Sequence, residues 1–564
     1  MTDESPKPLS PLIVEIELGS ELERFRPPHG DESESFKSTL KLYLQDLVSD
    51  LELPLSVHIN IRIDDGLNAP LVAPRWLRLR INRRRVRLAH EGEIEESTVG
   101  SGLAKRLARF VVQQPRSLMN NKIVTAIKEQ WAMSGVPWFK NHMSSDDFLE
   151  LLEALTSRGF RIGRAMEWAR LNSPPASLGQ EPDLVFEEVV APVGSCSLTA
   201  LLGGRLYAEA LATAAQPKLG TDDASFDGLM RMLRDGMFYE LGVYLPRVKL
   251  GEETVFAGDV YRFRFNDRRL LPQPGLASDQ IMVNAPAEEL EDLGIKGDES
   301  VNPANGNPVT LVPEVPEVVS KLREEGYWTW DRLGYVTLAL AAEIRLRAGD
   351  FQMRGVETSA LTSLAQAFPG LVSAARGRFG DDKLTRVFRG VADDHISIRD
   401  QRAMLEALLT IRRTVEVDFQ KAAILLNEVD ACAVASIKSV AELTVDELVS
   451  HCRRSQKRHI SQTYAPTGIL SCFVLDPSIC DRLRERGFDS LFDSEYDDLI
   501  RGVGRSLEQT PEGVNPVIVA PLDVRQLLRQ TIRISYPYYY VLCREELAPN
   551  VQLNVLGQLT WQTV

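Results

Sequence analysis

The tightest grouping of acid and imidazole side chains in this sequence is Asp393, Asp394 and His395. Neighbouring carboxyl and imidazole groups can exchange protons, but a catalytic site also needs a nucleophile and an orienting group within reach. The three residues fall in a polar turn between two helical patterns, so we interpret them as the end of one helix and the start of the next. No GxSxG, P-loop or GxGxxG pattern stands in a strand-to-helix context. We therefore expect a protein that is not an enzyme.

The thiol and imidazole side chains are spaced too irregularly for a metal centre. No CxxC pair occurs among the six cysteines, and the seven histidines form no HExxH pattern. The cysteines are Cys196, Cys432, Cys452, Cys472, Cys480 and Cys543. We expect reduced thiols, no bound metal and no cofactor.

A second chemical candidate is the segment 75–87, which holds seven arginines and no acid. Apolar side chains alternate with these arginines, which predicts a strand with an apolar inner face and a basic open face. The open face is either a solvated basic surface or a docking surface for phosphates, anionic lipid or an acidic partner. The candidate binding residues on it are Arg78, Arg80 and Arg84.

The overall charge argues against one broad class of function. Lys and Arg total 65 against 79 for Asp and Glu, which gives a formal net charge of -14. An acidic chain of this kind is a poor nucleic-acid binder as a whole, so nucleic acid is an unlikely partner. The first ten residues lack the basic and apolar regions of a signal peptide, and no apolar stretch approaches the ~20 residues that span a bilayer. We expect a cytoplasmic protein without membrane insertion.

Helical and strand patterns alternate along the chain. Apolar residues recur at three-to-four spacing in 226–241, which predicts a helix with one buried face. Residues 260–265 alternate apolar and polar side chains, which predicts a half-buried strand. Together these patterns predict an α+β, multi-domain architecture with small mixed subdomains and a mainly helical middle subdomain.

Two segments far apart in the sequence suggest an internal repeat. The helical pattern of 36–51 matches that of 226–241, and each is followed by a proline-bearing turn and a strand. The strand segments 77–84 and 261–268 also agree, because arginine or asparagine stands at the same four positions in both. We interpret the N-terminal region as a degenerate copy of one small domain; the alternative is a coincidence of generic amphipathic patterns.

The segment 384–408 resembles the helix, turn and "VPIRD...ILE.L" helix of the FHIPEP family, the large export-gate subunits of flagellar and virulence type III secretion systems. The matching positions are Ile396, Ile398, Arg399, Asp400, Arg402, Leu405, Glu406 and Leu408. From 183 to 560 the order of segments is similar to the cytoplasmic half of that family. The family's transmembrane half has no counterpart, and residues 1–180 stand in its place.

The resemblance implies a non-enzymatic platform that docks protein clients or export-machinery components. It also implies a homo-oligomer, such as a ring, and peripheral association with a membrane complex. Arg399, Asp400, Arg402 and Glu406 would then belong to the oligomer interface or form a structural motif.

The resemblance also divides the chain. An N-terminal region, 1–171, is followed by a linker at 172–182. The first export-gate-like subdomain covers 183–269 and 314–345, and a small subdomain, 270–313, is inserted in it. A helical subdomain covers 346–432, and a C-terminal α/β subdomain covers 433–564.

Family members carry a "DPAFG" signature followed by an apolar strand with a tryptophan, and these contribute to a chaperone-docking groove. Here Asn302 replaces the acid, Asn305 the aromatic residue and Leu311 the tryptophan. With Val309 on the same strand, these residues are the candidate partner-binding positions. Loss of the aromatic anchors predicts an altered groove, and a solvated turn is the alternative.

A different class of function is a repurposed scaffold or regulator outside secretion. It would use the arginine segment 75–87 to bind an acidic partner or nucleic acid. The gene neighbourhood separates the two hypotheses, because export-apparatus genes nearby would favour the first.

Overall fold

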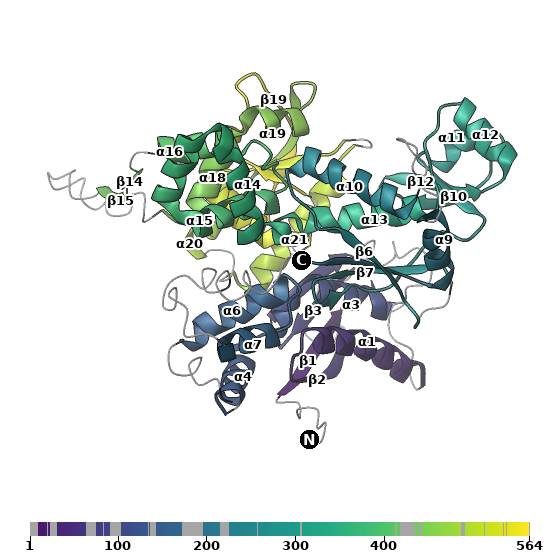
Figure 1. Ribbon diagram of the computed structural model, residues 1–564, viewed down its shortest axis with the longest axis horizontal. Helices are drawn as coiled ribbons and strands as arrows, with labels where there is room; N and C mark the ends of the chain where they lie inside the picture. Colours follow the sequence, from purple (N-terminus) through teal and green to yellow (C-terminus); the bar gives the residue numbers. More distant parts are fainter. Residues whose placement is uncertain are drawn as a thin grey trace.

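The computed structural model mixes helices with several small sheets (Figure 1), which confirms the predicted α+β class. It describes residues 10–19, 21–22, 31–63, 75–82, 84–90, 103–133, 135, 143–171, 186, 196–214, 225–255, 258–304, 307–411, 414–417, 435–438, 443–486, 491–511, 514–533, 535–536 and 539–562. The predicted linker 172–182 lies outside these ranges.

A four-stranded sheet with the order β2-β1-β3-β4 forms the N-terminal unit. Its elements are β1 (Ser10–Leu18), α1 (Asp31–Asp50), β2 (Leu55–Ile63), β3 (Trp76–Ile81) and β4 (Arg84–His90). β1 is parallel to β2 and antiparallel to β3. The alternation predicted for the arginine segment is present in β3, where Leu77, Leu79 and Ile81 are buried.

A second sheet repeats this topology. Its elements are β5 (Leu198–Leu202), α9 (Gly204–Ala214), α10 (Phe226–Leu241), β6 (Val248–Glu252), β7 (Val260–Phe265), β8 (Arg268–Arg269) and β9 (Gln273–Pro274). The order is β6-β5-β7-β8, with β5 parallel to β6 and antiparallel to β7. The predicted duplication requires this shared strand order, in which a helical connection joins two parallel strands and an antiparallel strand follows; the second unit has both α9 and α10 in that connection.

The turn after the third strand is also the same in both sheets. Asn82 and Asn266 have positive φ angles of 49° and 56°. Asn82 Oδ1 accepts a hydrogen bond from the backbone N–H of Ile13 at 3.0 Å, and Asn266 Oδ1 accepts one from Ser197 at 2.9 Å. Asparagine tolerates left-handed backbone because its short polar side chain bonds locally.

Helical segments follow the sheet in the described part of the N-terminal region. They are α3 (Leu103–Gln113), η2 (Pro115–Leu118), α4 (Asn121–Met133), α6 (Ser145–Ser157) and α7 (Gly163–Leu171). Ser144 caps α6 by accepting a hydrogen bond from the N–H of Asp147. This cap agrees with the serines that precede an acidic first turn.

The inserted subdomain has its own sheet, in the order β11-β12-β10-β13. Its elements are β10 (Gln280–Val283), α11 (Ala287–Glu291), β11 (Asp298–Val301), β12 (Pro308–Pro313), α12 (Pro316–Glu324) and β13 (Thr329–Trp330). The predicted end at 313 is wrong, because β13 pairs with β10 and Leu322 of α12 lies in the core of this subdomain.

The helical middle subdomain also extends further than predicted. It contains α13 (Arg332–Leu346), η3 (Ala348–Phe351), α14 (Arg354–Ala367), α15 (Pro369–Asp393), α16 (Gln401–Thr410), α18 (Val445–Ser455) and α19 (Lys457–Tyr464). Two short strands, β14 (Thr414–Val417) and β15 (Ala435–Lys438), pair antiparallel. A Cβ on Gly390 would lie 2.7 Å from Val449, and His451 Nε2 lies 3.0 Å from the carbonyl oxygen of Ala407. α18 therefore packs on α15 and α16, beyond the predicted boundary at 432.

The C-terminal subdomain is built on a parallel sheet with the order β18-β17-β16-β19. Its elements are β16 (Ile469–Leu475), α20 (Pro477–Arg486), α21 (Asp493–Glu508), β17 (Val517–Val519), α22 (Leu522–Ile532), β18 (Val541–Leu542), η6 (Arg544–Glu546) and β19 (Gln552–Leu559). All three strand pairs are parallel, and the β-α-β order matches the prediction for the closing segment.

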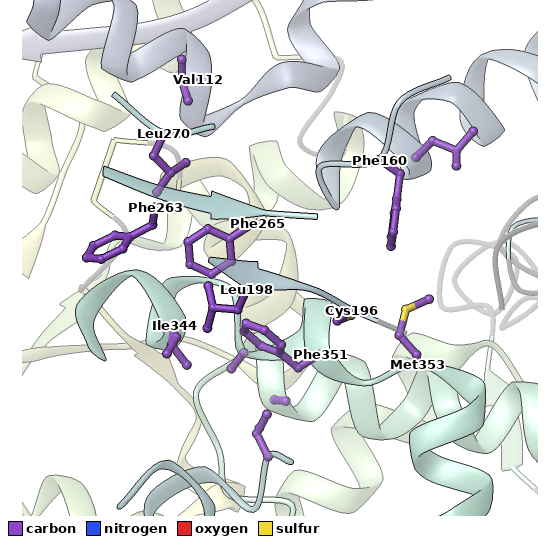
Figure 2. Packing of buried hydrophobic residues seen from close by; sticks show 14 of the residues in the cluster. Val112, Phe160, Cys196, Leu198, Phe263, Phe265, Leu270, Ile344, Phe351 and Met353 are labelled. Carbon is purple, nitrogen blue, oxygen red and sulfur yellow. The ribbon is translucent and has the colours of Figure 1, made fainter. Parts of the chain in front are cut away.

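One buried apolar cluster joins the N-terminal region to the rest. Val112 of α3 and Phe160 lie in the same cluster as Leu198, Phe265 and Phe351 (Figure 2). Trp76 and Leu88 of the N-terminal sheet belong instead to the core of the C-terminal subdomain. The N-terminal unit is therefore packed into the body at two places. In the part of the chain that the structure describes, no helix combines the length and apolar character needed to cross a bilayer.

Candidate functional site

The polar face of β3 is covered by side chains from other parts of the same chain. Arg78 Nη1 donates to Glu17 Oε2 at 2.8 Å, and its Nη2 pairs with Asp497 of α21. The Arg78 side chain is only 12% exposed, and Arg80 Nε lies 4.0 Å from the same Glu17 oxygen. The structure therefore overturns the docking-surface hypothesis for Arg78: its acidic partner belongs to the C-terminal subdomain. Arg84 begins β4, and its side chain lies outside the described residues.

The second sheet is covered in a similar way. Arg262 on β7 pairs with Glu253 at 2.5 Å and lies 3.9 Å from Asp46 of α1. Arg269 binds Asp50 of the same helix at 2.7 Å. In both sheets, an arginine of the third strand meets an acidic residue on a helix of another unit.

Asp393, Asp394 and His395, at the end of α15, lie where the helical subdomain contacts the C-terminal subdomain. Arg453 Nη1 and Arg525 Nη1 donate to Asp394 Oδ2 at 2.9 and 3.1 Å. Arg453 also makes two hydrogen bonds to Glu546, at 2.6 and 2.8 Å. Burial alone would raise the pKa of Asp394, but Arg453, Arg525 and Arg529 outweigh it and lower the pKa to about 2.

The other two members of this group are also buried. Burial and the charge of Asp350 raise the pKa of Asp393 to about 6. Burial, followed by the charge of Arg529, lowers the pKa of His395 to about 4. The His395 ring packs edge-on against Tyr540 with ring centres 5.4 Å apart. These contacts agree with the interpretation of the group as a structural turn.

The family-like motif at 396–406 packs against the end of α10. Ile398 N–H donates to the carbonyl oxygen of Leu241 at 2.8 Å, and Asp400 caps α16 by accepting from the N–H of Ala403 at 3.0 Å. Gly242, with φ of 75°, leaves no room for a Cβ, which would lie 2.3 Å from the backbone nitrogen of Arg399. Asp400 therefore has a structural role.

The charged residues of the motif remain near the surface. Arg399 lies over the ring of Tyr239 at 5.0 Å, and Arg402 lies over Phe368 at 4.6 Å. Arg402 also pairs with Glu406 at 2.8 Å, with both side chains about half exposed. An exposed surface of arginine and aromatic rings has the composition of a protein interface.

The candidate groove residues of the inserted subdomain divide into core and surface positions. Val309 is buried, and Leu311 packs with it against the same small core below α13. Val309 stabilises the subdomain and is closed to a partner, so its assignment to a partner-binding surface is wrong. Leu311 is only partly buried, and its assignment stays a prediction. Asn302 is 5% exposed and binds Asn284 Oδ1 through its Nδ2 at 3.3 Å. Asn305 lies outside the described residues.

A tryptophan that sequence reasoning missed stands next to this asparagine pair. Trp328 is 76% exposed, although it is among the largest apolar side chains. Its carbonyl oxygen accepts a hydrogen bond from Asn284 N–H at 3.1 Å. Trp328, Asn284 and Asn302 thus lie at one end of the inserted sheet. The available signal was the pair of tryptophans in 327–331, of which Trp330 packs inward.

The residues that the structure describes contain no group of three or more His, Cys, Asp or Glu side chains placed to hold a metal ion. Within the same ranges, five cysteines are buried and unbridged. Buried Arg453 and Arg525 pair with Asp394 and Glu546, which come from distant segments, and this is the arrangement expected of structural ion pairs.

The chain belongs to the FHIPEP family, whose model matches residues 210–552. Curated relatives include low calcium response locus protein D of Yersinia pestis, 24% identical over 205 residues, which are 31% of this chain and 29% of that protein. Invasion protein InvA of Salmonella typhimurium is 21% identical over 348 residues, 60% of this chain and 46% of InvA. The chain spans less than half the length of these relatives.

The fold is shared with the CdsV protein of Chlamydia pneumoniae. That structure aligns with a TM-score of 0.53 and 20% identity, over 65% of this chain and 98% of CdsV. A structure of the CdsV and CdsO complex aligns with a TM-score of 0.52 over 64% of this chain. Family and fold together make this chain a relative of the cytosolic domains of type III secretion export proteins.

Proposed function

We propose that this chain is a non-enzymatic platform that docks protein clients, or their chaperones, for an export machine of the type III class. The docking position is the end of the inserted sheet marked by Trp328. An exposed tryptophan is the observation that carries this proposal, because aromatic side chains anchor a large share of protein interfaces. The hydrogen bond between exposed Asn284 and buried Asn302, together with the bond from Asn284 N–H to the Trp328 carbonyl oxygen, fixes the backbone beside the tryptophan.

The altered groove fits this proposal. Leu311 stands where the family's tryptophan is expected, and it is partly buried. Trp328 supplies an aromatic anchor at the surface of the same subdomain. Clients of this chain would therefore meet a different anchor from the one implied by the family signature.

Family membership also supports self-association, with Arg399, Arg402 and the aromatic rings beside them at the contact between copies. A location in the cytoplasm, next to a membrane complex, follows from the same proposal. The alternative of a regulator that works through the arginine segment has less support, because Arg78 already pairs with Asp497.

A photocrosslinking amino acid at position 328 tests the docking role in the source cells. The matched control is the same substitution at Val255, which is 75% exposed and lies in another unit. We expect crosslinks to a chaperone or an export substrate at 328 and none of these at 255. Crosslinks only to abundant unrelated proteins, equal at both positions, would contradict the proposal.

Trp328→Ala then measures the strength of the anchor with the crosslinked partner. Loss of a central aromatic anchor weakens binding by about 2 kcal/mol or more. The free energy of unfolding should change by less than ~0.5 kcal/mol, because the side chain is exposed. Unchanged affinity by calorimetry would remove Trp328 from the docking site.

A further inference from the structure

The last strand of the C-terminal sheet, β19, is an edge strand with unusual composition. It pairs with β16 on one side, and no other strand that the structure describes pairs with it. Alternate N–H and C=O groups of an edge strand point away from the sheet and can pair with another chain. β19 is eight residues long, with the sequence QLNVLGQL.

Soluble proteins guard such edges with charged residues, prolines or very short strands. The other edge strands described in this chain follow that rule. β2, β4, β6, β8, β11, β14 and β15 each contain a charged residue, whereas β9, β13 and β18 are only two residues long. β19 carries no charge and no proline. It is the one long edge, among those described, with neither a charged residue nor a proline. Its pairing with β16 shifts register between Val555 and Gly557, so the regular part of the edge is 552–555.

The side chains of β19 are open as well. Leu553 and Val555 lie on one face of the strand and are 36% and 54% exposed. On the opposite face, Asn554 Nδ2 donates to Ser471 Oγ of β16 at 3.3 Å, and Ile469 beside it is half exposed. The strand therefore offers an aliphatic pair on one face and a neutral polar residue on the other.

The far end of the strand is closed by α21. A Cβ on Gly502 would meet the carbonyl oxygen of Thr560 at 2.3 Å, and Arg501 Nε donates to the carbonyl oxygen of Gln562 at 3.0 Å. The open part is 552–557, or roughly 20 Å at ~3.3 Å per residue. This length suits one extended segment, whereas a second copy would bring its own α21 to the same opening.

We propose that β19 is a strand-addition site that captures an extended, uncharged segment of a partner protein. Main-chain hydrogen bonds give the affinity, and aliphatic side chains at alternate positions of the segment pack against Leu553 and Val555. Charged residues in the segment are disfavoured, because β19 offers them no opposite charge. The site lies on the C-terminal subdomain, apart from the inserted unit with α11 and α12 (Figure 1).

The test uses the full chain and a fluorescent ten-residue peptide of alternating valine and threonine with a polyethylene-glycol tail. We expect saturable binding in fluorescence anisotropy and slower amide hydrogen exchange at 552–557. The same peptide with methyl groups on alternate amide nitrogens should bind at least tenfold more weakly, because it cannot complete the ladder. Equal binding of the methylated peptide would overturn the proposal.

Val555→Lys places a charged residue on the edge strand and should weaken peptide binding at least tenfold. Val255→Lys makes the same change at an exposed position elsewhere and should leave binding unchanged. Leu553→Lys is the second variant, and thermal unfolding verifies that each variant is folded. Unchanged peptide binding in both edge variants would overturn the proposal. So would a concentration-dependent dimer, seen by sedimentation, that Val555→Lys abolishes and the peptide does not displace. Trp328→Ala should leave the peptide affinity intact, which separates this site from the proposed docking anchor.

Discussion

Arg78 on strand β3 and Asp497 on helix α21 form a buried ion pair between the first and last units of the chain. Glu17 on the adjacent strand binds the same guanidinium at 2.8 Å. The Arg78 and Asp497 side chains are 12% and 3% exposed, so water cannot replace the pair if one partner is lost.

Arg78→Ala should lower the free energy of unfolding by about 3 kcal/mol, because Asp497 and Glu17 then stay buried without the guanidinium that binds both of them. Arg402→Ala is the control, since its pair with Glu406 is exposed to water and should contribute little to stability. Urea unfolding measures both. If the two variants lose the same stability, the pair does not join the units as we describe.

Gly242→Ala tests how tightly the 396–406 motif packs on α10. A Cβ at Gly242 would lie 2.3 Å from the Arg399 backbone nitrogen. The φ angle of 75° adds a conformational cost for alanine. We expect a loss of about 3 kcal/mol. Gly258→Ala has φ of 93° with nothing within 4 Å, so only the conformational cost of ~1 kcal/mol should appear. Thermal unfolding of the pair isolates the steric part, and equal losses would contradict the close packing.

The two asparagine turns should respond unequally to alanine. Both side chains accept a backbone hydrogen bond, but Asn266 Nδ2 also donates to the carbonyl oxygen of Arg158 at 2.7 Å. Asn82→Ala should cost ~1 to 2 kcal/mol, and Asn266→Ala about 1 kcal/mol more. Chemical unfolding of both variants checks the order. A larger loss at Asn82 would mean that the second copy does not depend on this extra bond.

A buried carboxyl in the helical subdomain predicts a pH dependence. Burial and the charge of Asp381 raise the pKa of Glu357 from 4.5 to about 8, and Gln401 Nε2 donates to its Oε1 at 3.1 Å. Between these values the folded state holds a proton that the unfolded state releases, so stability falls as the pH rises, by up to ~1.4 kcal/mol per unit. Glu357→Gln should flatten the unfolding free energy between pH 5 and 8 and stabilise the protein at pH 8.5.

Glu406→Gln is the matched control, because it replaces an exposed carboxyl by the same amide. In that variant the free energy of unfolding, measured at each pH, should change with pH as steeply as in the wild type. If the free energy of unfolding of Glu357→Gln keeps the wild-type pH dependence too, another buried acid, such as Asp393, causes that dependence.

The sequence could predict elements whose pattern is local. The alternation of arginine with leucine was enough to predict β3, because side chains in a strand point to opposite faces in turn. It could not predict what covers the basic face, because Asp497 is distant in sequence and only the fold brings it close. The same reasoning explains why a docking surface was assigned to Arg78.

The inserted subdomain shows the limit of a family signature. Val309 and Leu311 occupy the expected strand, yet Val309 is buried and Leu311 partly buried, since a family alignment fixes chain order and does not fix which face is exposed. Trp328 precedes a strand of only two residues, which is too short to show an alternation of apolar and polar side chains. Its exposure could be learned only from the structure.

The pairing of Arg78 with Asp497 also has a consequence during synthesis. The partners are 419 positions apart, which at 5 to 20 residues per second separates their appearance by roughly 20 to 80 s. During that interval the N-terminal sheet must persist with its outer face incomplete. Arginines and glutamates on that face are hydrated during the interval. Trp76 and Leu88, which lie on the same face and later enter the C-terminal core, remain exposed until that core forms, and a more apolar face would invite aggregation on the ribosome.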